Sequence, residues 1–248
     1  MTDQHVIRYK PDETDLQVWD PMESESLLSG NPVQRGCEYF RSHQGKLHSG
    51  IWDCTAFETR LAPYDVHEFM LLLEGSVTII DADNKEYRFH QGQGFVIPKG
   101  LNCRWKQDDY VKKFYVILED ASDPATTVGD FDKPILLDPA LPLTAMTGLN
   151  ADDFIGDLPE MSIQNFYQDA ANQFNVGVWE STAMTRVPGT IGRSELMHIV
   201  SGQGEVVNGD GVRYGFGPGD TFMVPINMGY QWVSEQPVKK IFCSFAPG

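Results

Sequence analysis

Apolar and polar positions along the chain alternate in short runs that are typical of β-strands, with hardly any helical periodicity. The run FMLLLEGSVTII at residues 69–80 is apolar and rich in strand-forming side chains, with Gly75 in its middle as a bend or bulge. The turn-forming clusters DADN and HQGQG flank a short run, KEYRF, and a further run, FVIP, follows. Short strands at near-regular spacing predict an all-β sandwich or barrel.

This pattern occurs twice. Residues 196–207, LMHIVSGQGEVV, are followed by the turn NGDG, the run VRYGF, the turn GPGD and the run TFMVP. A shift of 127 residues, without a gap, superimposes the bulky and turn-forming residues of the two copies. Such a constant offset indicates a tandem duplication. The aligned pairs are Trp52/Trp179, Glu68/Glu195, Gly75/Gly202, Gly92/Gly219, Phe95/Phe222, Pro98/Pro225, Trp105/Trp232, Lys112/Lys239 and Lys113/Lys240.

The duplication predicts four segments. Residues 1–37 are expected to form an N-terminal arm with one strand, and residues 38–118 the first barrel. Residues 119–164, rich in Asp, Pro, Ala and Thr, form a connection in which NADDFIGDLPE is predicted to make one short helix. Residues 165–248 are the second barrel.

Composition and charge narrow the classes of partner. The 248 residues carry a formal charge of -16, which argues against a nucleic-acid partner. There is no apolar run long enough to span a membrane, and the polar N-terminus lacks the apolar core of a secretory signal. The four cysteines have neither CxxC spacing nor the density of a disulfide scaffold, so a cytoplasmic protein with reduced thiols is expected.

Two spacings resemble the signature motifs of the cupin superfamily. The first is Glu68 and, after six intervening residues, Gly75. The second is Gly92, followed after five intervening residues by Pro98, with Gly100 two positions later. The resemblance implies jelly-roll barrels, so the chain is expected to be a bicupin with two barrels in tandem. Cupins include isomerases, dioxygenases, hydrolases, sensors and storage proteins, and the fold therefore implies no single function.

The end of the first copy, PKGLNCRWKQDDYVKKFYVIL, looks more like the ureidoglycine-aminohydrolase-type subgroup, through Trp105 and Lys113. That subgroup also contains relatives from ethanolamine utilisation. The resemblance implies chemistry on small nitrogen compounds.

The positions at which these resemblances would place metal ligands carry other side chains. A germin-like centre would have histidines at Ala62, Tyr64 and Cys103, and at Gly189, Ile191 and Tyr230 in the second copy. An aminohydrolase-like centre would have Glu at Ala62 or Gly189, and His at Tyr64 or Ile191 and at Glu68 or Glu195.

A first-row metal ion needs at least three convergent donors. His67 does not supply one beside Glu68, because neighbouring side chains on a strand point to opposite faces. The histidines are interpreted as surface or packing residues. No conventional metal centre and no cofactor is predicted, and the alternative is a divalent metal on the atypical set Tyr64, Glu68 and Cys103.

Glu68 and Glu195 occur at equivalent positions, and so do Lys113 and Lys240 on the run that closes each copy. A jelly roll brings these two strands together, and a buried carboxylate needs a partner. We therefore predict inward-facing ion pairs Glu68–Lys113 and Glu195–Lys240. Each pair either fixes the register of its barrel or forms a site with perturbed pKa values that binds a small polar molecule or moves a proton.

Residues on the same face as each glutamate predict a pocket. Arg193 is notable because a guanidinium can bind a carboxylate. The tryptophans serve either as core or as pocket walls. Cys103 could be activated by a nearby lysine, but it is interpreted as an inert small hydrophobe. The pocket residues are Tyr64, Val66, Met70, Leu72, Cys103, Trp105 and Gln107 in the first barrel, and Ile191, Arg193, Met197, Tyr230 and Trp232 in the second.

Three classes of function follow. The leading one is a cytoplasmic bicupin that binds a small nitrogenous or carboxylate-bearing metabolite. Its first barrel is the better candidate, through Tyr64, Glu68, Cys103, Trp105 and Lys113. The second is a hydrolase, lyase or isomerase on small nitrogen compounds, using the atypical metal set or a metal-free acid–base step at Glu68. The third is a structural scaffold for a homodimer, with the N-terminal arm crossing to the partner.

Overall fold

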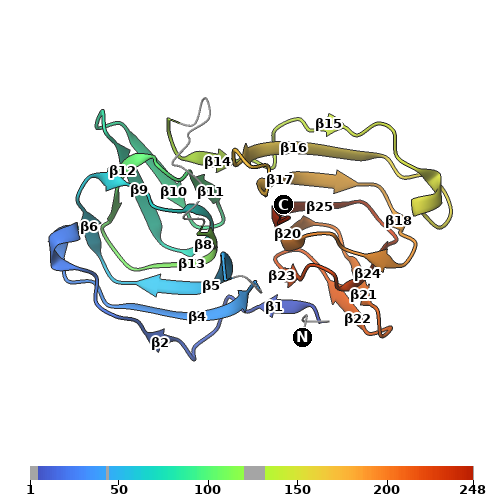
Figure 1. Cartoon of the computed structure of the whole chain (residues 1–248), viewed down its shortest axis with the longest axis horizontal. Helices are drawn as coiled ribbons and strands as arrows, with labels where there is room; N and C mark the ends of the chain where they lie inside the picture. The colour runs from blue at the N-terminus through green and yellow to red at the C-terminus, as the bar shows by residue number, and fades with distance from the viewer. Residues whose placement is uncertain (1–4, 43–44, 120–131, 248) are drawn as a thin grey trace. The chain divides into compact units, whose positions relative to one another are not determined.

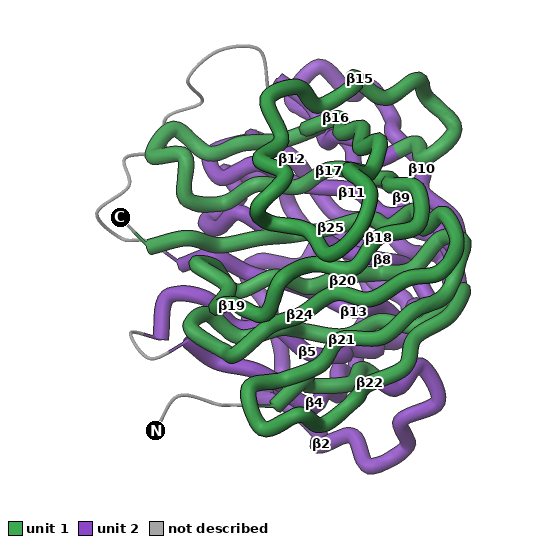
Figure 2. Tube along the Cα trace, turned by 90° about the vertical axis from the view of Figure 1, so that its right-hand side faces the viewer, with its two compact units in different colours: residues 1–9, 138–248 green, residues 10–137 purple. Residues whose placement is uncertain are grey.

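The computed structural model describes residues 5–42, 45–119 and 132–247, and their regular secondary structure is almost entirely β-strand (Figure 1). Their contacts divide the chain into two compact units (Figure 2). One unit is residues 10–137, here called the first barrel. The other is residues 1–9 together with 138–248, here called the second barrel. Among the described residues, no helix approaches the length and apolarity needed to cross a bilayer.

The first barrel is a jelly roll of two antiparallel sheets that enclose one hydrophobic core. The larger sheet has the order β14 (Ile135–Leu137), β11 (Gly94–Ile97), β8 (His67–Glu74), β13 (Val111–Leu118), β5 (Leu47–Cys54), β4 (Gln34–Arg41) and β2 (Gln17–Val18). The smaller sheet has the order β10 (Glu86–His90), β9 (Ser76–Asp81), β12 (Asn102–Gln107), β6 (Phe57–Thr59) and β3 (Leu27–Gly30), and β7 (Ala62–Pro63) also pairs with β12.

The second barrel repeats this architecture around its own core. Its larger sheet has the order β1 (Ile7–Tyr9), β23 (Thr221–Val224), β20 (Ser194–Ser201), β25 (Val238–Phe245), β17 (Phe174–Ser181), β16 (Met161–Gln168) and β15 (Thr144–Ala145). Its smaller sheet has the order β18 (Met184–Thr185), β24 (Gly229–Ser234), β21 (Gly204–Asn208) and β22 (Arg213–Phe216), and β19 (Gly189–Thr190) also pairs with β24.

The predicted strands and the glycine between β8 and β9 are confirmed. Gly75 has a φ of 81°, and a Cβ added there would lie 2.2 Å from the backbone oxygen of Tyr110. Both the left-handed conformation and the close approach require glycine at this position. Gly202, its equivalent in the second barrel, has a φ of 85° and the same crowding against Pro237.

Each larger sheet ends in a strand that the repeat alone does not reveal. In the first barrel β14 pairs with β11, and Ile135 lies opposite Val96. In the second barrel β1 pairs with β23, and Ile7 lies opposite Met223, which is 127 residues after Val96. Ile7 and Ile135 are thus equivalent, although 128 residues separate them. The two copies exchange their edge strands, since the strand that precedes each copy completes the other barrel.

Two local predictions differ from the structure. Residues 1–37 contain β1, β2, β3 and the start of β4 rather than one strand. The segment NADDFIGDLPE forms only a 3-10 turn, η2 (Ala151–Asp153), capped by the side chain of Asn150. The turn does not propagate because Phe154 is extended and buried in the second core, and Gly156 has a φ of 94°. The other 3-10 turn, η1 (Ser24–Ser26), precedes β3.

Candidate functional site

The predicted pair in the first barrel is confirmed. Lys113 Nζ donates a hydrogen bond to Glu68 Oε1 at 2.7 Å, and both side chains are less than a tenth exposed, at 8% and 5%. The two residues meet because β8 and β13 are neighbouring antiparallel strands. The Tyr64 hydroxyl donates a hydrogen bond to Oε2 of the same carboxylate. Both carboxylate oxygens therefore have donors, as a buried carboxylate requires.

The Lys113 ammonium also lies between two indole rings. Its Nζ is 4.8 Å from the ring centroid of Trp52 and 4.8 Å from that of Trp105. Trp52 lies directly beside Lys113 on β5, whereas Trp105 comes from β12 of the other sheet. The Met70 sulfur is 3.1 Å from Nζ. Cation–π attraction to two rings adds to the ion pair and holds the charge inside the barrel.

The second barrel repeats the arrangement. Lys240 Nζ lies 2.7 Å from Glu195 Oε1, 3.3 Å from the Met197 sulfur, and 4.9 and 5.1 Å from the ring centroids of Trp179 and Trp232. The difference is at the outer oxygen of the carboxylate. There, Arg193 Nε donates to Glu195 Oε2 at 2.5 Å. A guanidinium thus replaces the phenol that occupies this place in the first barrel.

The protonation states follow from burial and charge. Burial alone would raise the pKa of the Glu195 carboxyl, but Lys240 and Arg193 outweigh it and hold that pKa below its ordinary value. Burial lowers the pKa of the Lys240 ammonium, an effect that Glu195 offsets only in part. Burial, together with the Glu68 charge, raises the pKa of the Tyr64 hydroxyl well above its ordinary value, so the hydroxyl stays protonated and donates its hydrogen bond to Glu68.

A cavity reaches the pair in each barrel. The first cavity, of about 280 Å³, has mainly aromatic walls, including Trp19, Phe57 and Tyr115. Its polar and charged lining residues include Tyr64, Glu68, Lys113, His48 and Thr59. The second cavity, of about 580 Å³, is larger and also contains Glu195, Lys240 and Arg193. Tyr230 and Arg186 line the second cavity as well.

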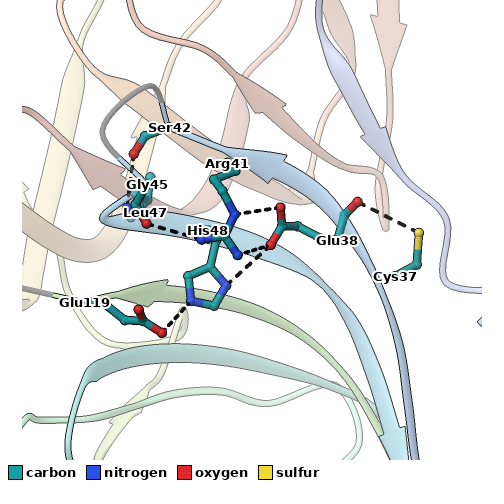
Figure 3. Close-up of polar contacts among 8 residues, drawn as sticks. All are labelled: Cys37, Glu38, Arg41, Ser42, Gly45, Leu47, His48 and Glu119. Carbon is teal, nitrogen blue, oxygen red and sulfur yellow. Dashed lines mark hydrogen bonds and ion pairs between the residues drawn. The ribbon is translucent and has the colours of Figure 1, made fainter. Parts of the chain in front are cut away.

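His48 lines the first cavity and belongs to a polar network that the sequence did not suggest (Figure 3). Its Nε2 lies 3.1 Å from Glu119, its Nδ1 lies 3.9 Å from Glu38, and Glu38 also pairs with Arg41. The ring makes an edge-on contact with Tyr115 at 5.9 Å. From the sequence the histidines are interpreted as surface or packing residues, and the sequence does not predict the carboxylate partners of His48. Its carboxylate partners lie on β4 and just after β13, so no local spacing points to them.

The other predicted site residues divide into two groups. The first group lines the cavities: Tyr64, Glu68, Trp105 and Lys113 line the first cavity, and Arg193, Glu195, Tyr230, Trp232 and Lys240 line the second. Met70 is fully buried beneath Lys113. Cys103 lies in the first core and outside the lining of the described cavity, and burial and Asp81 raise the pKa of its thiol to about 12.

The donor sets do not fit a transition-metal ion. The described residues include no group of three or more His, Cys, Asp or Glu side chains that could hold a metal. In each barrel the glutamate of the pair has its inner oxygen, Oε1, bonded to the lysine ammonium. Indole rings and a thioether surround that ammonium. His67 accepts a hydrogen bond from the Lys99 backbone N–H at 3.4 Å. His67 is not among the residues that line the first cavity. His43 lies outside the described residues.

The EutQ-like cupin domain matches residues 41–115 and again residues 168–242. The chain belongs to this cupin family. A solved structure from Pseudomonas syringae pv. tomato str. DC3000, a DUF861-family protein of unknown function, superimposes with a TM-score of 0.76 at 22% identity, covering 98% of this chain and 100% of that one. A cupin 2 conserved barrel domain protein from Leptotrichia buccalis superimposes with a TM-score of 0.59 at 11% identity, covering 93% of this chain and 98% of that one.

The protein Ylba from E. coli, also of the DUF861 family, gives a TM-score of 0.57 at 10% identity, covering 98% of this EutQ-like bicupin and 91% of that chain. At such identities the likeness shows the fold alone. None of the curated protein sequences matches this chain.

Proposed function

We propose that this bicupin binds small organic molecules in its two cavities, each against a buried carboxylate–ammonium pair and without a metal centre. The observation that carries the proposal is that each cavity opens onto its Glu–Lys pair and two tryptophans. In both barrels the two members of the pair line the cavity, although each side chain is less than a tenth exposed. The volumes, about 280 and 580 Å³, are close to or within the usual range of ligand pockets.

A catalytic role is the second candidate, and one contact favours it. The Tyr64 hydroxyl donates a hydrogen bond to the Glu68 carboxylate at the wall of the first cavity, and this carboxylate could act as the base of a metal-free acid–base step. Such a step would serve a hydrolase, lyase or isomerase on small nitrogen compounds. The likeness of residues 98–118 to ureidoglycine-aminohydrolase-type cupins supports the same substrate class.

Calorimetry and thermal-shift measurements with a panel of small amines, amides and carboxylic acids test binding. The wild type is compared with Glu68→Gln and Glu195→Gln, and with Glu205→Gln, which removes an exposed carboxylate that pairs with Arg213. We expect ligands whose binding is lost in one of the first two variants and unchanged in the third. If no compound binds the wild type, or all variants bind alike, the proposal is wrong. Following the same mixtures by NMR for product formation separates binding from catalysis.

Elemental analysis of the purified protein tests the donor argument directly. We expect less than stoichiometric manganese, iron, zinc or nickel, because neither pair offers three convergent ligands. A stoichiometric metal that Glu68→Gln or Glu195→Gln removes would contradict the proposal.

We further propose a cytoplasmic location, supported by the four cysteines, which are all free thiols. Homodimerisation stays a prediction from the sequence, and sedimentation velocity would check it.

A further inference from the structure

The two cavities differ in charge although their buried pairs are alike. In the first cavity the charges of Glu68 and Lys113 cancel, and Tyr64 adds only a neutral hydroxyl. His48 also lines this cavity, and the carboxylates of Glu38 and Glu119 lie against its ring. The second cavity is lined by three cations, Arg186, Arg193 and Lys240, and by two anions, Asp153 and Glu195. The balance there is one positive charge in a chain whose formal charge is -16. A cationic cavity in an acidic protein favours an anion from solution.

Arg193 presents this charge to the cavity in a fixed orientation. Its Nε is bonded to Glu195, whose side chain is only 1% exposed and is itself held by Lys240. The Arg193 side chain is half exposed, at 50%, and within the described part of the chain its Nη atoms make no hydrogen bond or ion pair. A guanidinium has five N–H donors, and its fork matches a carboxylate. One donor is used inside the protein, and the outer edge remains for a ligand.

The groups around Arg193 complete a binding site for an organic acid. Tyr230 lines the cavity, and burial keeps its hydroxyl protonated by raising the pKa, so it can donate a hydrogen bond. Arg186 lies over the Phe154 ring at 5.6 Å, and its Nη2 is 3.8 Å from the Asp153 carboxylate. The remaining walls are largely apolar and include Met161, Met184 and Trp179. Such walls suit an apolar or aromatic body attached to the carboxylate.

We propose that the second barrel binds the carboxylate of a small organic acid on the outer edge of Arg193, while the first barrel shows no such preference. The inference rests on the proposed function and names the ligand class of one of its two cavities. The equivalent of Arg193 in the first barrel is Val66, which has no donor to offer.

The test compares pairs of probes that differ only in charge, benzoate with benzamide and phenylacetate with phenylacetamide, in the full-length protein. Calorimetry should show the carboxylates binding about 10- to 100-fold more tightly than the amides, the usual effect of a charge-assisted fork. Arg193→Gln, which keeps a donor for Glu195, should abolish the preference. Arg213→Gln removes an exposed arginine that pairs with Glu205 outside the cavity and should leave the preference unchanged.

Methionine methyl groups report where the probes bind. Met161 and Met184 line the second cavity and Met22 lines the first, so carboxylate probes should shift the NMR signals of Met161 and Met184 and not that of Met22. Equal affinity for acids and amides in the wild type, or carboxylate shifts at Met22 alone, would overturn the inference while leaving small-molecule binding intact. If no acid or amide bound at all, the proposed function itself would fail. The wild-type comparison stands even if Arg193→Gln does not fold.

Discussion

The first and second barrels share an inner pair and differ at its outer edge. In both, an ammonium is held by one carboxylate oxygen, a thioether and two indoles, at distances that agree within a few tenths of an ångström. The other carboxylate oxygen takes a phenol from Tyr64 in the first barrel and a guanidinium from Arg193 in the second. The comparison separates two roles. The pair is common to both barrels, and the third group makes the difference in charge between the two cavities.

The largest effect should come from removing the ammonium. Lys113→Met leaves Glu68 buried with only Tyr64 as partner, and we expect a loss of about 3–5 kcal/mol in the free energy of unfolding. Lys240→Met leaves Glu195 paired with Arg193, and the loss should be roughly half as large. Urea unfolding, with amide exchange followed on β8 and β13 or on β20 and β25, measures each barrel separately.

Neighbouring lysines on the same strands are matched controls. Lys112 donates to the Glu13 backbone oxygen and Lys239 pairs with Glu180, both nearer to solvent. Their methionine variants should lose about 1 kcal/mol or less, as exposed pairs do. Equal losses for Lys113→Met and Lys240→Met would show that Arg193 does not stabilise the second carboxylate.

Acid should weaken the second barrel through a residue that the first lacks. His198 accepts or donates a hydrogen bond with Thr221 at 2.8 Å, and burial lowers its pKa to about 4, from 6.5. The unfolded chain therefore takes up the proton first as the pH falls. Neutral His198 makes its full contribution to the free energy of unfolding above pH 6.5. As the pH falls from 6.5 to about 4 this contribution is lost, and the loss is about 3 kcal/mol at most.

Leucine occupies the equivalent position, 71, in the first barrel, so His198→Leu is the natural comparison. Amide exchange in β20 and β23 at pH 7 and pH 4.5 should show a pH-dependent loss in the wild type that is much smaller in the variant. His5→Gln, which removes the exposed histidine beside Tyr214, serves as the control. An identical acid response in wild type and His198→Leu would contradict the assignment.

The repeat allowed the inner pair to be predicted from the sequence, but not the strand exchange. Glu68 and Lys113 recur at one constant offset, and strand alternation places them on one face, so their contact followed from pattern alone. Ile7 and Ile135 are offset by one more residue and lie in strands of three residues, too short to show alternation. An ungapped comparison of the two copies therefore misses them.

Contacts between side chains that lie far apart in the sequence could not be predicted from it either. Tyr64 and Arg193 were predicted to share a face with their glutamates. The sequence did not predict that each would bond the outer oxygen, Oε2, of the carboxylate. The tryptophans were expected to be core or pocket walls, and their position over the lysine ammonium depends on the packing of one sheet on the other. His48 meets carboxylates on other strands, which no spacing encodes.

A smaller effect is expected from the phenol of the first barrel. Tyr64→Phe removes one donor from the Glu68 carboxylate, and the free energy of unfolding should fall by about 1.5–3 kcal/mol, the usual range for a hydrogen bond to a charged group. Tyr87→Phe, which removes a 3.2 Å hydrogen bond to Asp81 near the surface, should change it by less. Amide exchange should register the Tyr64→Phe effect in β8 and not in β20. No loss in Tyr64→Phe would show that the hydrogen bond from Tyr64 does not stabilise the Glu68 carboxylate.

The smallest effect is expected when the folded protein is treated with a thiol reagent, because Cys103 should hardly react. The equivalent of Cys103 in the second barrel is Tyr230. Burial raises the pKa of this thiol from 9.0 to about 12, so its thiolate fraction at pH 8 is about a thousandth of that of an ordinary cysteine. Iodoacetamide followed by peptide mass spectrometry should label Cys37, which is partly exposed, long before Cys103. In urea the difference between them should vanish, which serves as the control. Rapid labelling of Cys103 in the folded protein would instead indicate an accessible thiolate and would restore the atypical set of Tyr64, Glu68 and Cys103 as a candidate for catalysis or metal binding.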